Sequence, residues 1–319
     1  SYSVLLALPL MHLGRIATVY QMGMISIDSV QKILNSEVPS TDLLRMDDDE
    51  KSSLRGSTLW VKNLSYRYPN TKDEHNDAAL KDISFSIEAG EKVGVLGSIG
   101  SGKSTLVNCL NHHLSLESGH VFWGEKDITH MSRQDWRSYV RTITQEPFLF
   151  SDTISENIKF GAKQQYDQHH QQQHPATDDL DVNQVLELSQ LKEDVQRFGA
   201  GDQTLVGEKG IMLSGGQKQR LSIARALLTP SDLIIMDNVL SAVDYETERT
   251  ILKGVFNRIQ GQSLLVVSHR VSALEYMDKI LVLEKGEIIA RGTHTELLKN
   301  SRYYRETWEL QQHESETNS

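Results

Sequence analysis

The chain has 319 residues, a formal net charge of −10 and a sequence pI of about 5.6. This length suffices for one large or two ordinary domains with a substantial core. An acidic chain lacks the basic surface that nucleic-acid binding requires, so no nucleic-acid partner is expected. The single cysteine, Cys109, excludes an internal disulfide and a thiolate metal cluster.

Near the N-terminus, apolar residues recur at helical spacing from Leu13 to Leu34 and predict one long helix. The first apolar run is shorter than the roughly 20 residues that span a bilayer, and it lacks the basic region of a signal peptide. The helix either leaves a membrane or packs as an ordinary amphipathic helix on its own domain. Residues 37–56 are polar, with an acidic run from Asp47 to Glu50, and predict a linker with a domain boundary near residue 55.

Strand and helix patterns alternate after residue 57, which predicts an α/β fold. Apolar runs predict strands at residues 57–68, 83–88, 92–97, 233–236, 264–267, 280–283 and 287–290. Helical patterns start near residue 103 and cover residues 217–228 and 245–259, and Thr293 with Glu296 makes a capping box before a last helical region. Residues 164–179 are rich in glutamine and histidine and predict a disordered insertion.

The run from Gly97 to Thr105 has the spacing of a phosphate-binding loop between a buried strand and a helix. Its glycines let successive backbone N–H groups converge on phosphates, and the helix presents its positive end to them. We expect Lys103 to reach the β- and γ-phosphates and Ser104 to offer its hydroxyl to Mg²⁺. The residues expected to hold ATP here are Gly97, Ser98, Ile99, Gly100, Ser101, Gly102, Lys103, Ser104 and Thr105.

Asp237 ends the apolar run Leu233-Ile234-Ile235-Met236. This position is the carboxyl end of a predicted buried strand, where open α/β sheets bind their ligands. A carboxylate there can hold Mg²⁺ through water and complete the metal site that Ser104 begins. Asp237 is therefore expected to bind both the nucleotide and the metal.

Together these segments resemble the nucleotide-binding domain of ATP-binding cassette (ABC) transporters, over nearly all of residues 57–312. The resemblance implies an α/β P-loop NTPase cassette with a mixed sheet core, an antiparallel β subdomain and a helical signature subdomain. Its most specific part is Leu213 to Gln217, which looks like the family signature. In that family two cassettes meet head to tail, so each signature covers ATP held by the opposite loop. The residues implied to act in trans are Leu213, Ser214, Gly215, Gly216, Gln217 and Asp244.

Three further positions match the family one by one. Tyr68 is similar to the aromatic residue that stacks on adenine, although a strand tyrosine packed in the core would look the same. Gln145 resembles the glutamine that contacts Mg²⁺ and the attacking water, which places it with Ser104 and Asp237 in the implied metal site. His269 looks like the switch histidine that touches the γ-phosphate.

Residues 204–210 resemble the segment before the signature in the exporter branch of the family, in which Glu208 would contact the coupling loops of the membrane domain. A solvated turn is the alternative. In such exporters the last transmembrane helix runs into the cassette, so residues 1–36 are expected to be the cytoplasmic end of that helix. The resemblance then implies half a transporter in the cell (inner) membrane, with a cytoplasmic cassette, missing membrane helices and a disordered tail at residues 313–319.

Asn238 departs from the family, because active members carry glutamate directly after the aspartate that corresponds to Asp237. An amide cannot accept a proton, and losing a positioned general base costs about 10²- to 10⁴-fold in rate. We therefore expect ATP binding with slow hydrolysis at this chain's own site. An engineered substitution that traps ATP is the alternative origin of Asn238.

Unequal sites favour a heterodimer with a second ABC half-transporter over a homodimer. In it, the signature of this chain would complete the active site of a partner that keeps its glutamate, and both membrane domains would be engaged. The alternative function is a soluble ABC-family ATP switch that does not transport. An importer subunit is disfavoured, because those cassettes usually lack a fused membrane helix.

Overall fold

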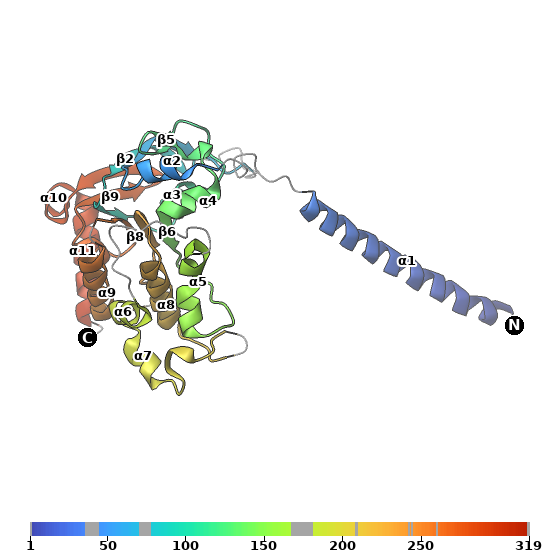
Figure 1. The fold of residues 1–319 in the computed structure, drawn as a ribbon. Helices are drawn as coiled ribbons and strands as arrows, with labels where there is room; N and C mark the ends of the chain where they lie inside the picture. Colours follow the sequence, from blue (N-terminus) through green and yellow to red (C-terminus); the bar gives the residue numbers. More distant parts are fainter. Residues whose placement is uncertain are drawn as a thin grey trace. The chain divides into compact units, whose positions relative to one another are not determined.

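The structure is a computed structural model that describes residues 2–35, 45–69, 78–166, 181–207, 210–241, 243, 245–259 and 261–317. The chain forms two compact units, Ser1–Leu43 and Leu44–Ser319, and each is described by itself. The smaller unit holds a single helix, and the larger one holds all strands of the described chain (Figure 1).

The helix of the smaller unit is α1 (Tyr2–Leu34), which contains the long helix predicted from the apolar spacing. Each of its side chains from Met11 to Leu34 is exposed. The large apolar ones are Met11, Leu13, Ile16, Val19, Tyr20, Met22, Met24, Ile25, Ile27, Val30, Ile33 and Leu34. None of the helices in the described part of the chain is both long enough and apolar enough to cross a membrane.

The larger unit contains two sheets. The antiparallel sheet has the strand order β2-β1-β4-β5, with β1 (Leu59–Tyr66), β2 (Leu80–Ile87), β4 (Val121–Trp123) and β5 (Lys126–Asp127). The second sheet has the order β10-β9-β3-β8-β7-β6, with β3 (Lys92–Leu96), β6 (Val140–Ile143), β7 (Leu233–Asp237), β8 (Ser263–Ser268), β9 (Lys279–Glu284) and β10 (Glu287–Gly292). All its neighbours are parallel except β9 and β10, which form the expected hairpin.

Helices pack around these sheets and form a separate group at one end. The helices of the larger unit are α2 (Asp48–Ser53), α3 (Lys103–Leu110), α4 (Arg133–Tyr139), α5 (Ile154–Tyr166), α6 (Val182–Leu188), α7 (Lys192–Arg197), α8 (Gly215–Leu228), α9 (Tyr245–Arg258), α10 (His294–Asn300) and α11 (Arg302–Thr317). Short 3₁₀ turns are η2 (Ile128–His130), η3 (Gly201–Gln203) and η4 (Ser272–Leu274). In Figure 1, α6 and α7 lie at the opposite end of this unit from β2 and β5, with α5 and α8 leading to them. The mixed core sheet, antiparallel sheet and helical subdomain agree with the predicted fold.

The central strands of the six-stranded sheet, β3, β8 and β7, are buried on both faces. Along β7, Ile234 and Met236 enter one apolar cluster, and Leu233 and Ile235 enter the other. This alternation follows from the two-residue period of a strand. A strand covered on both sides reads as a continuous apolar run, which is why the sequence predicted it.

Residues 45–56 were predicted to be part of a linker, but in the structure they fold onto the rest of the larger unit. The acidic run forms α2, with Asp47 as N-cap accepting from the amide of Glu50. Asp135 accepts from the Met46 amide and pairs with Lys51 at 3.0 Å. The unit boundary therefore falls after Leu43 rather than near residue 55.

Two helices also continue further than predicted, into segments that were expected to be disordered. Helix α11 runs to Thr317 and so extends into the tail expected to be disordered from residue 313. Helix α5 continues to Tyr166, into the predicted insertion at 164–179, whose remaining residues lie outside the described part of the chain. Helical hydrogen bonding propagates at little cost once a helix has formed, so polar residues can continue it past its last packed turn.

Candidate functional site

Four neighbouring parallel strands end at the same edge of the six-stranded sheet, in the order β3, β8, β7, β6. The registered pairs closest to this edge are Leu96 with Ser268, Asp237 with Val267, and Ile143 with Met236. Gly97, His269 and Asn238 directly follow β3, β8 and β7, and Gln145 is the second residue after β6. Four predicted site segments from distant parts of the sequence are thus brought to the edge where α/β sheets bind ligands.

The phosphate-binding loop, residues 97–105, connects β3 to α3 as predicted. Gly102 precedes α3 with a φ of 105°, and no side chain caps the helix. A Cβ on Gly102 would lie 2.7 Å from the carbonyl oxygen of Ala79, so no other residue fits without movement. The first amide groups of α3 therefore stay available to an anion.

Lys103 and Asp237 are close enough for each charge to affect the pKa of the other. The ammonium of Lys103 donates to the carbonyl oxygens of Gly97 at 2.7 Å and Ser98 at 2.8 Å. Burial lowers the pKa of Lys103, and the charge of Asp237 opposes that shift. Burial likewise raises the pKa of Asp237, and Lys103 opposes it. Two opposite charges thus line a partly desolvated position in which phosphate and a cation would be strongly bound.

These residues fit the nucleotide and the Mg²⁺ that the fold family uses. The hydroxyl oxygen of Ser101 is buried and has no hydrogen-bond partner among the described residues. Ser104 is exposed at the start of α3, and the carboxylate of Asp237 is only partly buried. The described residues contain no group of three or more His, Cys, Asp or Glu that could hold a metal ion. A site with one carboxylate and one hydroxyl suits Mg²⁺, which keeps waters and takes substrate phosphates as ligands.

Tyr68 lies beside the phosphate-binding loop. Its hydroxyl is 3.2 Å from Oγ1 of Thr105, and its ring meets Tyr66 edge-on at 5.2 Å. The side chain is 42% exposed, which disagrees with the alternative of a tyrosine packed in the core. An exposed ring next to the loop is available for stacking on a base.

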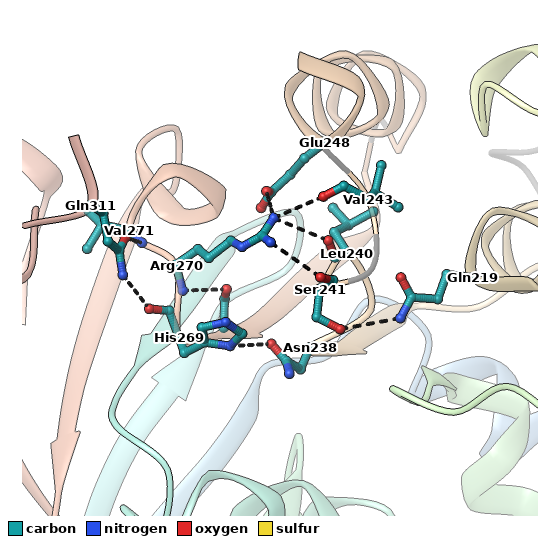
Figure 2. Close-up of polar contacts among 11 residues, drawn as sticks. Gln219, Asn238, Leu240, Ser241, Val243, Glu248, His269, Arg270, Val271 and Gln311 are labelled. Atoms are coloured by element: carbon teal, nitrogen blue, oxygen red, sulfur yellow. Dashed lines mark hydrogen bonds and ion pairs between the residues drawn. The ribbon is translucent and has the colours of Figure 1, made fainter. Parts of the chain in front are cut away.

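Asn238 and His269 are in direct contact, with 2.8 Å between Oδ1 of Asn238 and Nδ1 of His269 (Figure 2). Burial, followed by the charges of Arg270 and Lys103, lowers the pKa of His269, which favours the neutral imidazole. An amide oxygen can only accept, and Nδ1 therefore carries the proton. Asn238 has a φ of 50°, a left-handed conformation that asparagine tolerates better than glutamate does.

Arg270 connects this pair to the loop after β7, a contact that the sequence did not reveal. Its guanidinium donates to Glu248 at 2.9 Å and to the carbonyl oxygens of Val243 and Ser241 at 3.1 and 3.3 Å (Figure 2). The side chain of Glu248 is only 2% exposed and that of Arg270 is 32% exposed, so the carboxylate of this ion pair is buried. In the sequence, the one sign that Arg270 belongs to the site was its position directly after His269.

The signature segment, residues 213–217, begins α8 and is closed by its own side chains. Ser214 accepts from the amide of Gln217 at 3.2 Å, and Gln217 accepts from the amide of Ser214 at 2.9 Å. The Gln217 side chain also donates to Asp194 of α7 at 3.1 Å. Within the described residues no hydrogen bond joins this segment to the phosphate-binding loop.

Gln145 is exposed, and its backbone oxygen accepts from Gln219 of α8 at 3.2 Å. Gln219 also reaches Ser241 at 3.4 Å (Figure 2), so the signature helix touches two loops of the candidate site. Asp244 and Glu208 lie outside the described residues. Their predicted contacts stay predictions.

Comparison with protein families matches residues 80–241 to the family described as ABC transporter. The match runs from β2 through the phosphate-binding loop and the signature segment to Ser241. It covers about half of the chain and includes most of the candidate site.

Two curated relatives align along nearly the whole chain. A probable multidrug resistance ABC transporter ATP-binding/permease protein of Bacillus subtilis is 35% identical over 95% of this chain and 48% of its own length. An ATP-dependent lipid A-core flippase of Pseudomonas putida is 36% identical over 94% of this chain and 46% of its own length. The chain therefore spans about half the length of the curated relatives it matches.

The fold is also similar to a solved structure, a bacterial Atm1-family ABC exporter with ATP bound. The TM-score is 0.73 at 26% identity, over 95% of this chain and 50% of that chain.

Proposed function

The chain belongs to the ABC transporter family, and from that premise we propose that it is the ATP-binding part of a membrane exporter whose own ATP site hydrolyses slowly. In this proposal residues 97–105, Tyr68 and Asp237 bind ATP, with Ser104, Asp237 and Gln145 holding Mg²⁺. The bound metal would supply charge neutralisation at the phosphates. Lys103 would leave the carbonyl oxygens of Gly97 and Ser98 and turn to the nucleotide.

The contact between Asn238 and His269 carries the proposal of slow hydrolysis. At the position where the family has its glutamate, a neutral amide bonds to a neutral imidazole at 2.8 Å. Asn238 can orient His269 and can bind a water molecule, but it cannot remove a proton from that water. The chemistry that remains is binding of the nucleotide and positioning of the γ-phosphate.

The experiment compares ATP turnover of the unmodified chain with that of Asn238→Glu, each assembled as an ATP-dependent dimer. Turnover should rise by about 10²- to 10⁴-fold, because a general base is restored. The left-handed backbone at position 238 should cost the variant about 1 kcal/mol of stability, so unfolding is measured in parallel.

Asn238→Gln is the matched control, since it has the length of glutamate without the charge. It should bind ATP and stay slow. Rapid turnover by the unmodified chain, or an equal gain with glutamine, would contradict the proposal.

We propose further that the signature segment acts on a second half-transporter, with a heterodimer favoured. Ser214 is exposed on the described chain, at the positive end of α8. A partner that carries a glutamate directly after the aspartate corresponding to Asp237 would provide the site that hydrolyses ATP. Mixing this chain with such a partner should give ATPase activity that depends on Ser214 of this chain.

Exposed apolar side chains of the helical subdomain support contact with the membrane domain. Phe148, Leu205 and Met212 are 70%, 51% and 76% exposed, and Ile211 donates its amide to the Leu205 carbonyl. Arg225 of α8 holds the Phe148 backbone by donating to its carbonyl oxygen at 2.9 Å. Large apolar side chains gathered on a surface mark interaction sites, and residues 204–210 were expected to meet the coupling loops.

Helix α1 supports a membrane location for the intact protein. Its exposed apolar side chains require partners, and the proposed ones are other helices of the same transporter near the cytoplasmic surface. Fractionation of the intact protein with membranes would support this assignment, and its recovery in the soluble fraction would contradict it.

A further inference from the structure

The C-terminal helix α11 makes a two-point contact with the segment that carries the switch histidine. Gln311 accepts the backbone N–H of Val271 on Oε1 at 2.8 Å and donates from Nε2 to the backbone oxygen of His269 at 2.8 Å. Figure 2 shows the Gln311 side chain beside Val271, with a dashed line to the backbone oxygen of His269. One planar amide thereby fixes the backbone on both sides of Arg270.

The contact joins two groups that lie on either side of Arg270. In a parallel ladder, such a carbonyl group and N–H group would bond to the N–H and C=O of one residue on the neighbouring strand. Here the Gln311 amide provides both partners, one and three residues after Ser268, the last residue of β8. The side chain reaches these partners from 40 and 42 positions away in the sequence.

Fixing the backbone here also fixes two side chains that point elsewhere. The imidazole of His269 meets Asn238, and the guanidinium of Arg270 meets Glu248 and the carbonyl oxygens of residues 241 and 243. Because a side chain follows the φ and ψ of its own residue, a rotation of this segment would move both contacts together. Gln311 therefore acts at a position where one restraint controls two parts of the nucleotide site.

We propose that Gln311 is a positioning residue: it holds His269 toward the γ-phosphate and thereby makes α11 part of the discrimination between ATP and ADP. This inference rests on the proposed role of His269 in contacting the γ-phosphate. Gln311 lies outside the sheet edge that carries the candidate site, and its helix, α11, contains none of the nucleotide-binding motifs of the sequence.

The test measures dissociation constants of Mg-ATP and Mg-ADP for the full chain and compares their ratio. Gln311→Met preserves the size of the side chain and removes both hydrogen bonds. ATP binding should weaken by about 2- to 12-fold, the value of one hydrogen bond, while ADP binding stays unchanged. Leu310→Met is the matched control, because Leu310 is 67% exposed on the same helix, and it should change neither constant.

Two further measurements connect the effect to the contact itself. Amide hydrogen exchange at Val271 should accelerate in Gln311→Met, since its acceptor is lost. Gln311→Glu keeps the acceptor for Val271 and loses the donor to His269, so its ATP-to-ADP ratio should lie between those of the unmodified chain and Gln311→Met. Unchanged exchange at Val271, or equal weakening of ATP and ADP, overturns the inference.

The variant His269→Ala separates this inference from the function on which it rests. It should reduce the preference for ATP at least as much as Gln311→Met, and the double variant should add nothing further. If His269→Ala changes the ratio and Gln311→Met does not, only the role of Gln311 is wrong. If His269→Ala leaves the ratio unchanged, the proposed role of His269 is wrong, and the positioning role is overturned with it.

Discussion

Two helices of the larger unit, α3 and α8, begin in glycine-containing segments, and they differ in whether a side chain caps their first amide groups. Helix α3 starts at Lys103 behind Gly102, which has a φ of 105° and gives no side-chain cap. Helix α8 starts at Gly215 behind Ser214, and a reciprocal capping box with Gln217 closes it. Both are positive helix ends that favour an anion, but only the first leaves its first-turn amide groups free of a side-chain cap.

This difference in capping fits the different tasks proposed for the two helix ends. The open end of α3 must enclose phosphates from its own chain, so it needs free amide groups and a mobile lysine. The closed end of α8 has to keep its shape before any partner arrives, and its capping box does that without a ligand. A rigid, pre-capped surface loses little conformational entropy when it meets another molecule's ATP.

The largest effect should come from Lys103→Met, which removes the charge at the open helix end. ATP affinity should fall by about 10- to 150-fold, as expected for losing hydrogen bonds from a charged group worth about 1.5–3 kcal/mol. Calorimetric titration with Mg-ATP measures it. Lys299→Met, at an exposed position on α10, controls for the lost positive charge and should bind ATP normally. An affinity loss below twofold for Lys103→Met would contradict the assignment of the open helix end.

A smaller effect is expected at the closed helix end. Ser214→Ala removes the cap and should lower the free energy of unfolding by about 1 kcal/mol. ATP affinity of the chain alone should not change, because this segment makes no hydrogen bond to its own phosphate-binding loop in the described chain. Urea unfolding and nucleotide titration measure the two quantities.

Ser214→Asp separates the cap from the proposed action in trans. Aspartate is an equally good N-cap, so stability should be retained. Its negative charge would oppose the γ-phosphate of a partner's ATP, and ATP-dependent dimerisation should be lost. Normal dimerisation of Ser214→Asp would contradict the role of the signature segment in trans.

The open helix end was predictable from the sequence because its chemistry is local. The spacing from Gly97 to Thr105 marks the loop between a strand and a helix within nine neighbouring positions, and β7 and β8 contain continuous apolar runs. Both runs form strands of the six-stranded sheet, as predicted. Hydrophobic periodicity and turn residues are patterns of neighbouring positions, so they can be recognised in a single sequence.

The contacts that the sequence did not reveal are all long-range. Gln311 with Val271, and Asp232 with Arg55 and Gly56, join residues whose separation in sequence exceeds any local pattern. Residues 45–56 read as a linker because their composition is polar, yet two aspartates of the larger unit, Asp135 and Asp232, bind them. Which polar residues find a buried partner depends on tertiary placement, and composition does not contain that information.

The smallest effect should come from Asp194, which supports the closed end from α7. Its carboxylate accepts from Gln217 at 3.1 Å and pairs with Arg220 at 2.8 Å, and both charged side chains are about one-fifth exposed. Asp194→Asn keeps an oxygen for Gln217 but removes the charge that Arg220 faces. We expect a loss of about 0.5 kcal/mol in unfolding free energy, since partly exposed ion pairs contribute little. That loss should shrink in high salt, whereas the loss in Ser214→Ala should not, because a neutral cap is not screened. A destabilisation by Asp194→Asn as large as that of Ser214→Ala, and insensitive to salt, would show that the capping box depends on α7 and is not closed by its own residues.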